Sequence, residues 1–215
     1  MANCNFSGII RLSLNNLSSL TKFDVGFNQI HGIILTNVGF TLSNHEFYSI
    51  ASNQFTGPIP AWVSNCTSLQ HLQLAMSKLS GTVPSLGNLH NLRWLTLSNN
   101  QLGSGGSADL DFLCSLTNST SLTGLEIANN NFGGLLSDCI SNYSSTLKVL
   151  RVFQNPISGM IPRGIGNLVN LERLQIEDNK LSGTIPDAFG NLQKLSYLGL
   201  SNNNFYGVIP SSFQI

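Results

Sequence analysis

The hydrophobic and polar positions of this 215-residue chain recur with a period of about 24 residues. In the last unit, Leu195, Leu198 and Leu200 precede Asn203, and Phe205 follows it. The same order, L-x-x-L-x-L-x-x-N-x-L followed by G-x-I-P, recurs upstream, with the asparagine position at residues 179, 155, 130, 100, 77, 53 and 28. From the C-terminal end the intervals are 24, 24, 25, 30, 23, 24 and 25 residues, so eight units share one register.

The alternation Leu-x-Leu in each unit predicts a short strand with one buried face. Intervals of about 20–29 residues are typical of leucine-rich repeats, whose parallel stacking closes a core that no single repeat could form. The pattern therefore predicts an α/β solenoid of mostly strand and coil: a right-handed leucine-rich-repeat superhelix with a parallel concave sheet. Cys4, Phe6, Gly8 and Ile10 match the end of one further unit. We interpret residues 1–215 as a single array of one partial and eight full repeats, uncapped at both ends.

The asparagine of each unit turns the chain out of the strand, and its amide can bond backbone groups that would otherwise be buried unpaired. Ser77 replaces the asparagine in one unit, and a hydroxyl reaches less far than an amide. The longest interval contains residues 103–116, whose Gly/Ser-rich start predicts a flexible loop on the outer or lateral side. The predicted structural ladder consists of Asn28, Asn53, Asn100, Asn130, Asn155, Asn179 and Asn203.

Composition excludes some classes of partner. Ten basic and ten acidic residues leave no net charge that would favour nucleic acid or an anionic membrane. Charged residues make up only 9% of the chain, against about 25% in an ordinary soluble domain. We find neither the basic start and apolar core of a signal peptide nor a run of about 18 apolar residues, so we expect no signal peptide and no transmembrane segment in this sequence.

Two segments carry a more specific pattern, S-G-x-I-P-x-x-x-G-N-L-x-x-L, at residues 158–171 and 182–195. This unit resembles the plant-type leucine-rich repeats of receptor-like kinases and receptor-like proteins. The segments LDFLCSLTNSTSL (110–122) and NNNFGGLLSDCISNYSSTL (129–147) are similar to the middle of the ectodomain in the plant immune receptor kinase subfamily. The resemblance covers essentially the whole chain.

The resemblance implies a cell-surface receptor with a signal peptide, repeats, a transmembrane helix and a cytoplasmic Ser/Thr kinase, acting in defence or developmental signalling. It also implies a location on the extracellular side of the plasma membrane, a peptide or protein ligand, and a co-receptor with a leucine-rich-repeat ectodomain. The Gly-rich loop, HRD and DFG motifs of kinases do not occur in the sequence, so no catalytic residue carries over. We expect a ligand-binding receptor fragment or truncated gene product that is not itself an enzyme and needs no cofactor.

Two alternatives remain open. A secreted inhibitor of pathogen polysaccharide hydrolases would be built of similar repeats, and a truncated locus would yield a product without function. Acidic residues such as Glu172 and Glu177 would suit a hydrolase, but Arg151 and Arg173 are neighbours, so we interpret the acids as members of surface ion pairs.

Five N-x-S/T sequons predict glycosylation in a secretory context. Chance sequons are common in a chain rich in Asn and Ser, so an unmodified asparagine is the alternative at each site. Four of the sequons fall at or near the G-N-L position on the outer side, where a glycan would leave the inner face free. The predicted acceptors are Asn5, Asn16, Asn65, Asn118 and Asn142.

The four cysteines have no metal-binding spacing and the four histidines are scattered over different units, so we expect no metal site. Cys114 and Cys139 lie on the outer side of successive repeats, where a disulfide would need Cα atoms within about 7 Å. We favour the interpretation of free thiols that replace small apolar residues, as free cysteines often do in cores. It applies to Cys4, Cys66, Cys114 and Cys139.

The side chains of a strand alternate between its faces, so positions six and four before each asparagine should point outward on the concave face. Adjacent strands lie about 4.8 Å apart, which predicts an aromatic stripe of Phe47, His71 and Trp94. An extended peptide would stack on Trp94, because large aromatic residues often contribute most of the binding energy at interfaces. The alternative is that these residues only solvate the sheet.

Further along the same face, Arg151, Phe153 and Arg173 should form a cationic patch with an aromatic edge that receives a carboxylate of the ligand. The predicted ligand-binding residues are Phe47, His71, Trp94, Thr96, Glu126, Arg151, Phe153, Arg173, Gln175 and Tyr197.

Overall fold

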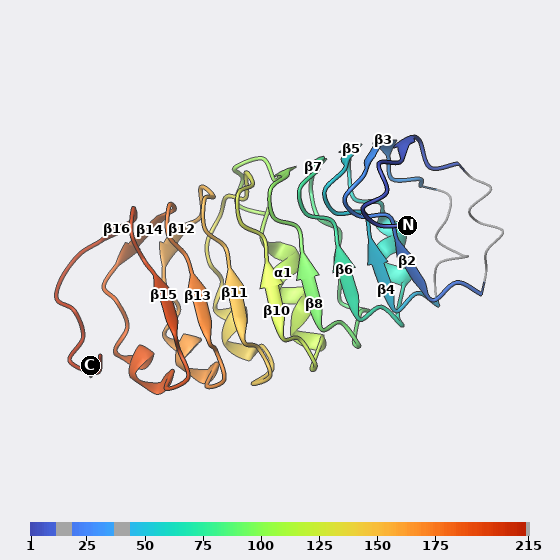
Figure 1. Ribbon diagram of the computed structural model, residues 1–215. Helices are drawn as coiled ribbons and strands as arrows, with labels where there is room; N and C mark the ends of the chain where they lie inside the picture. The colour runs from blue at the N-terminus through green and yellow to red at the C-terminus, as the bar shows by residue number, and fades with distance from the viewer. Residues whose placement is uncertain (12–18, 37–43, 214–215) are drawn as a thin grey trace.

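The computed structural model describes residues 1–11, 19–36 and 44–213. These residues form a solenoid in which successive turns contribute parallel strands to a main sheet, with further short strands in a second row along one edge (Figure 1). The predicted fold class is therefore confirmed: the chain is a leucine-rich-repeat solenoid of mostly strand and coil.

The main sheet orders its strands β15-β13-β11-β10-β8-β6-β4-β2, so neighbours in the sheet are also successive along the chain. The strands are β2 (Lys22–Asp24), β4 (Phe47–Ser49), β6 (His71–Gln73), β8 (Trp94–Thr96), β10 (Gly124–Glu126), β11 (Val149–Arg151), β13 (Arg173–Gln175) and β15 (Tyr197–Gly199). Their central residues pair in one register and point into the core. This buried column is Phe23, Tyr48, Leu72, Leu95, Leu125, Leu150 and Leu174, with the half-buried Leu198 at its end.

The second row is split into two sheets. One contains β1 (Ser7–Gly8), β3 (Gln29–Ile33), β5 (Gln54–Gly57), β7 (Lys78–Gly81) and β9 (Gln101–Leu102), and the other contains β12 (Ser158–Met160), β14 (Lys180–Gly183) and β16 (Asn204–Phe205). The break follows β9, where the expanded repeat begins, and a single bridge from Leu135 to Ser158 extends the second sheet backward.

Short helical turns return the chain to the next strand: η2 (Ala61–Asn65), α1 (Asp111–Ser115), η3 (Leu116–Asn118), η4 (Asp138–Asn142), η5 (Arg163–Asn167) and η6 (Asp187–Asn191). Pro60, Pro162 and Pro186 precede three of them with φ near −60 to −70°, the value that the ring imposes. Ser137 takes the proline position before η4 and caps the helix, because its hydroxyl accepts a hydrogen bond from the Cys139 N–H.

The asparagine side chains join successive turns by hydrogen bonds. Asn53 Nδ2 donates to the backbone oxygens of Val25 at 2.9 Å and Ile50 at 3.0 Å, and its Oδ1 accepts from the Ile30 N–H at 2.9 Å. Equivalent bonds surround the other six ladder asparagines. Ser77 makes no such bond, and its buried hydroxyl oxygen has no hydrogen-bond partner.

The segment 103–116 differs from the flexible loop that its Gly/Ser content predicts, because it is organised around a buried carboxylate. Asp109 Oδ2 accepts from the N–H groups of Ser104, Gly106 and Gly133, and Oδ1 accepts from the Ser104 hydroxyl, all at 2.9–3.0 Å. Burial raises the pKa of the Asp109 carboxyl, but these hydrogen bonds outweigh burial, and the pKa is lowered below its ordinary value. The helix α1 (Asp111–Ser115) begins two residues after Asp109, within the same segment.

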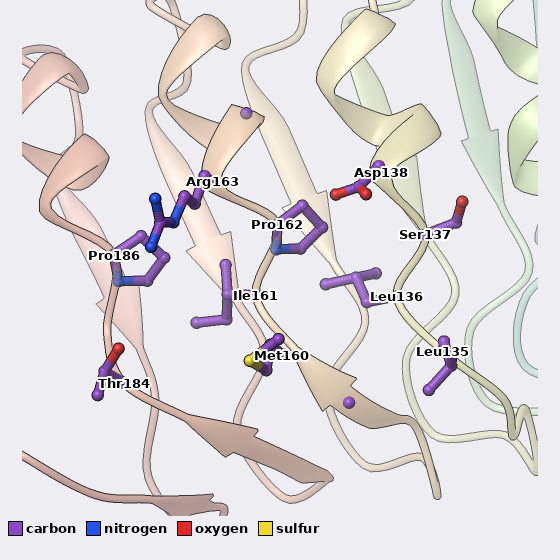
Figure 2. Close-up of a pocket in the computed structure, with 12 residues that line it drawn as sticks. Leu135, Leu136, Ser137, Asp138, Met160, Ile161, Pro162, Arg163, Thr184 and Pro186 are labelled. Carbon is purple, nitrogen blue, oxygen red and sulfur yellow. The ribbon is translucent and has the colours of Figure 1, made fainter.

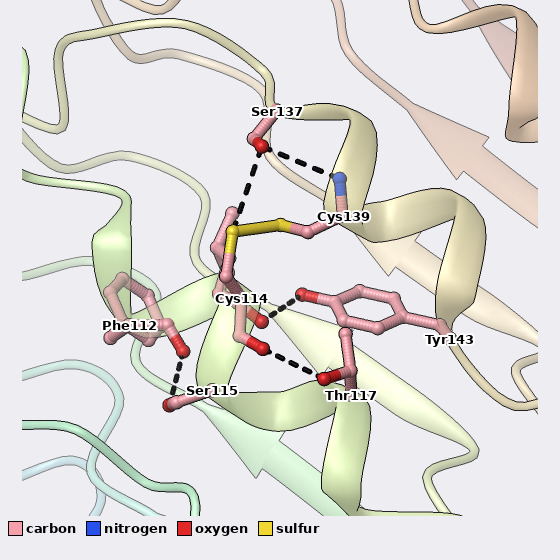
Figure 3. Close-up of a disulfide and its surroundings, with 8 residues drawn as sticks. Phe112, Cys114, Ser115, Thr117, Ser137, Cys139 and Tyr143 are labelled. Atoms are coloured by element: carbon pink, nitrogen blue, oxygen red, sulfur yellow. Dashed lines mark hydrogen bonds between the residues drawn. A yellow bond between two sulfur atoms is a disulfide. The ribbon is translucent and has the colours of Figure 1, made fainter.

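The prediction of four free thiols is wrong. Cys114 and Cys139 form a disulfide with a Cα–Cα distance of 5.3 Å, which joins the helical side of two successive turns (Figure 3). Beside the bridge, the Tyr143 hydroxyl donates to the Leu113 carbonyl oxygen at 2.9 Å, so the same two turns are also joined by a hydrogen bond. Sequence spacing could not decide this pairing, because stacking of the turns sets the distance between the two Cα atoms.

Cys66 is a free buried thiol, as predicted, whereas Cys4 is free but exposed and does not replace a core residue. Cys66 is buried, and this burial raises the pKa of its thiol to about 11, so the group stays protonated near neutral pH. Within the described part of the chain, no helix is long and apolar enough to cross a membrane, and no cluster of metal-binding side chains occurs.

Candidate functional site

The open face of the main sheet, opposite the buried leucine column, carries two columns of side chains. Strand register pairs Phe47 with His71 and His71 with Trp94 in the first column, so the three rings lie on adjacent strands. The ring centroids of Phe47 and His71 are 5.8 Å apart with an interplanar angle of 38°. All three residues are half-buried. We call Phe47, His71 and Trp94 the aromatic shelf.

The polar side chains on and directly beside the aromatic shelf are uncharged and have no hydrogen-bond partner in the part of the chain that the structure describes. Gln73 and Thr96 flank the rings in the second column, and neither side chain has a hydrogen bond to another described residue. Burial, together with the positive charge of Arg93, lowers the pKa of the His71 imidazole, so the ring is neutral at neutral pH. Free hydrogen-bonding groups therefore lie beside the rings.

The next strands of the same face carry one ion pair and one hydrogen-bonded carboxylate, in which Arg151 Nε and Glu177 Oε2 are buried without a partner among the described residues. Arg151 Nη1 lies 2.9 Å from Glu126 Oε2, with 32% of the arginine and 16% of the glutamate side chain exposed. Glu177 Oε1 accepts a hydrogen bond from Gln175 Nε2 at 3.0 Å. We call the four residues Glu126, Arg151, Gln175 and Glu177 the paired polar group.

Arg173 differs from Arg151 in having no partner. It is exposed on β13, next to Val149 and Tyr197 in the register, and it makes no ion pair or hydrogen bond to another described residue. Phe153 is half-buried just beyond the end of β11. The structure thus leaves one free guanidinium, that of Arg173, in the predicted cationic patch, and whether the patch binds a ligand stays a prediction.

Two features of this face escaped the sequence analysis. Gly124 and Gly199 occupy outward positions of β10 and β15, and a neighbouring side chain lies over each of them: Trp94 over Gly124 and Glu177 over Gly199. The available signal was a glycine in a column otherwise filled by larger side chains. Which neighbour would cover the space was decided by rotamers in the folded sheet.

The predicted glycosylation sites share a local position. Asn65, Asn118 and Asn142 are the last residues of η2, η3 and η4, and all three are exposed. Asn5 is exposed near the N-terminus, and Asn16 lies outside the described residues. The helical turns lie away from the open face, so glycans there would leave the aromatic shelf accessible; occupancy of the sites stays a prediction.

A lateral groove of about 840 Å³ lies along the second row, where β12 leads into η5 and β14 leads toward η6 (Figure 2). Its apolar wall includes Leu135 and Met160, which are 64% and 68% exposed. Asp138 and Arg163 lie at the rim, and neither has an ion pair with a described residue. The groove offers aliphatic surface without an aromatic ring, so it is chemically distinct from the aromatic shelf.

Comparison with protein families identifies the repeat. The family described as "Leucine rich repeat" matches residues 145–205, and a second model described as "Leucine Rich Repeat" matches residues 91–116.

Curated relatives are plant receptors. The chain is 46% identical over 86 residues to the LRR receptor-like serine/threonine-protein kinase EFR of Arabidopsis thaliana, an alignment that covers 40% of this chain and 8% of the kinase. It is 39% identical over 169 residues to receptor-like protein 53 of the same plant, which covers 73% of this chain and 17% of that protein. The chain therefore spans less than a fifth of these relatives.

Solved structures extend the similarity to nearly the whole chain. The LRR ectodomain of the receptor kinase GASSHO1/SCHENGEN3 from Arabidopsis thaliana, in complex with CASPARIAN STRIP INTEGRITY FACTOR 2, matches with a TM-score of 0.89 and 31% identity over 97% of this chain and 24% of that one. The plant peptide hormone receptor RGFR1 in complex with RGF2 matches with a TM-score of 0.86 and 32% identity over 96% and 32%.

Proposed function

We propose that this chain, an array of leucine-rich repeats homologous to those of plant receptor kinases and receptor-like proteins, is the ligand-binding segment of a cell-surface receptor-like Ser/Thr kinase. The ligand is a peptide or protein that binds the open face of the main sheet. The segment lies on the extracellular side of the plasma membrane and acts in defence or developmental signalling, with a leucine-rich-repeat co-receptor as a further partner.

The aromatic shelf is the observation that supports this proposal most. Trp94 and its two neighbours expose ring surface beside unpaired hydrogen-bonding groups on a rigid sheet, and Trp is among the residue types that dominate binding energy at interfaces. Parallel strands hold these residues in fixed register, so a ligand meets a surface that is already ordered.

The similar solved structures support the same reading. One of them is the plant peptide hormone receptor RGFR1 in complex with RGF2, and 96% of this chain matches that structure. An extended peptide across the open face would reach both the aromatic shelf and the free guanidinium of Arg173, two strands beyond β10.

The binding face can be tested with peptides selected from a displayed library of extended sequences on the secreted, folded chain. We expect Trp94→Ala or Arg173→Ala to weaken binding of the selected peptides by at least about 30-fold, which corresponds to the usual hot-spot threshold of about 2 kcal/mol. Gln193→Ala is the matched control, because Gln193 is exposed next to η6, away from the main sheet.

Selected peptides that bind both variants as tightly as the wild type would place their site elsewhere on the molecule. Binding measurements with the Leu135→Asp and Met160→Asp variants would then show whether the selected peptides bind in the lateral groove instead.

A further inference from the structure

Gly124 lies directly beneath the indole of Trp94. A Cβ atom added to Gly124 would lie 2.5–2.6 Å from Trp94 Cε3, Cδ2 and Cζ3, three adjacent carbons of the six-membered ring. Near-equal distances to adjacent ring atoms place the added carbon over the face of the ring, because contact with the ring edge would make one distance much shorter than the other two. The indole therefore lies flat on the Gly124 backbone.

No other residue type permits this arrangement. Carbon atoms cannot approach within about 3 Å without a shift of one of them, and any L-residue at position 124 carries a Cβ. Within the first column of the main sheet, Gly124 is the residue without a side chain, between Trp94 on β8 and Val149 on β11. Trp94 makes no ring contact with His71, so the support of its ring comes from the side of β10.

The surroundings of the ring select the chemistry of its partner. Trp94 Nε1 has no hydrogen-bond partner among the described residues, and the neighbouring positions of the second column carry the neutral side chains of Gln73 and Thr96. Arg93, the exposed residue before Trp94, brings a positive charge close enough to act on His71, so a cationic ligand group is disfavoured here. Glu126 and Arg151, which lie one and two strands away from β8, pair with each other. A flat π-surface with neutral polar side chains beside it and one positive charge nearby suits an uncharged ring rather than a cation, since two aromatic rings are attracted in an offset stacked arrangement.

We propose that Gly124 is a positioning residue that holds Trp94 as a flat stacking surface, and that this surface receives an uncharged aromatic side chain of the ligand. The inference rests on the proposed function for the ligand, whereas the role of Gly124 is a property of the chain itself. The two parts are therefore measured separately.

The first experiment needs no ligand. Gly124→Ala should displace the indole, so the near-ultraviolet circular dichroism of Trp94 is lost and its acrylamide quenching rises; subtraction of the matching Trp94→Phe spectra removes the contribution of Trp62. Gly199→Ala is the matched control, because it should displace the Glu177 side chain on the same face and leave the Trp94 signals unchanged.

If Gly124→Ala folds poorly, the free energy of unfolding provides a second test, measured with and without the indole of Trp94. The clash requires the indole, so the loss of stability caused by Gly124→Ala should disappear in a Trp94→Ala background. An equal loss in both backgrounds, or unchanged Trp94 spectra in a folded Gly124→Ala protein, overturns the positioning role.

The second experiment uses N-acetylphenylalaninamide as the aromatic probe, with N-acetylprolinamide, N-acetylleucinamide and cellobiose as comparisons. We expect a saturable change of Trp94 fluorescence with the aromatic amide that is lost in Gly124→Ala. No saturable change, or a stronger response to the proline amide or the sugar, overturns the assignment of an aromatic side chain, while the structural result for Gly124 stands independently.

Discussion

The open face of the main sheet has two halves with opposite chemistry. On β4, β6 and β8 the aromatic shelf presents rings with neutral polar groups beside them that have no hydrogen-bond partner among the described residues. On the following strands the paired polar group joins Arg151 to Glu126 in an ion pair and Gln175 to Glu177 by a hydrogen bond, and only Arg151 Nε and Glu177 Oε2 stay buried without a partner among the described residues. Free polar groups beside an exposed ring retain their capacity to bind a ligand, while an ion pair must first be broken to do so. All of these residues occupy outward positions of the repeat. The difference teaches that those on β4, β6 and β8 keep free groups suited to binding, whereas the paired polar group stabilises the sheet.

The expanded repeat lies between these halves, since residues 103–116 connect β8 to β10. Asp109→Ala should have the largest effect, a loss of about 3 kcal/mol of unfolding free energy, because the N–H groups of Ser104, Gly106 and the buried Gly133 lose their charged acceptor. Chemical denaturation measures the loss. Asp111→Ala is a control at an exposed position of the same segment; an equal effect from both would contradict the role of the buried carboxylate.

The pH dependence follows from the lowered pKa of Asp109. A carboxyl with a folded-state pKa below the unfolded value stabilises the protein above the unfolded pKa of about 3.9, and this stability is lost as pH falls through the folded pKa. Denaturation curves at acidic pH should therefore converge for wild type and Asp109→Asn. Curves that stay parallel through this range would show that the carboxylate charge makes no contribution.

Breaking the ion pair tests whether the second half is structural. Arg151→Ala should cost about 1–2 kcal/mol of unfolding free energy, because the mostly buried Glu126 carboxylate loses its partner. Thermal unfolding of the single variants and of Glu126→Gln with Arg151→Gln gives the coupling between the two residues. Trp94→Ala should change stability less than Arg151→Ala, and the reverse order would invalidate the division between the halves.

Ser77, which follows β6 in the half with the aromatic shelf, replaces an asparagine of the ladder. Ser77→Asn should raise the unfolding free energy by about 1 kcal/mol, since the amide can replace a buried hydroxyl that has no partner. The reverse substitution, Asn100→Ser in the next turn, should lower it by a similar or larger amount because Asn100 bonds Leu74 O and Leu79 N. No gain from Ser77→Asn would show that the turn cannot accommodate the longer side chain.

The smallest expected effect concerns His71 in the aromatic shelf. Its folded-state pKa is lowered, so the unfolded chain binds a proton more readily, and stability should fall slightly as pH decreases below the unfolded value of about 6.5. NMR titration of the imidazole gives the pKa directly, and His71→Gln should remove this part of the pH dependence. A titration at or above the ordinary value would contradict burial of the ring.

The repeat period by itself determined the solenoid, the asparagine positions and the order of side chains along each column. This was possible because one-dimensional stacking places every contact between neighbouring turns, so the spacing of leucines fixes both strand and register. Sequence also identified the ring-bearing residues of the shelf, since alternation along a strand assigns each residue to a face.

Tertiary structure decided which of these side chains find partners. The ion pair of Arg151, the seat of Trp94 on Gly124, the disulfide between Cys114 and Cys139 and the carboxylate cluster of Asp109 all join residues about one repeat apart, or across a loop, at distances set by side-chain rotamers and loop path. A periodic pattern places Cβ atoms in columns, but it does not fix the direction of a long side chain within its column. The physical reason is that rotamer choice depends on the space left by the neighbouring turn, and that space exists only in the folded array.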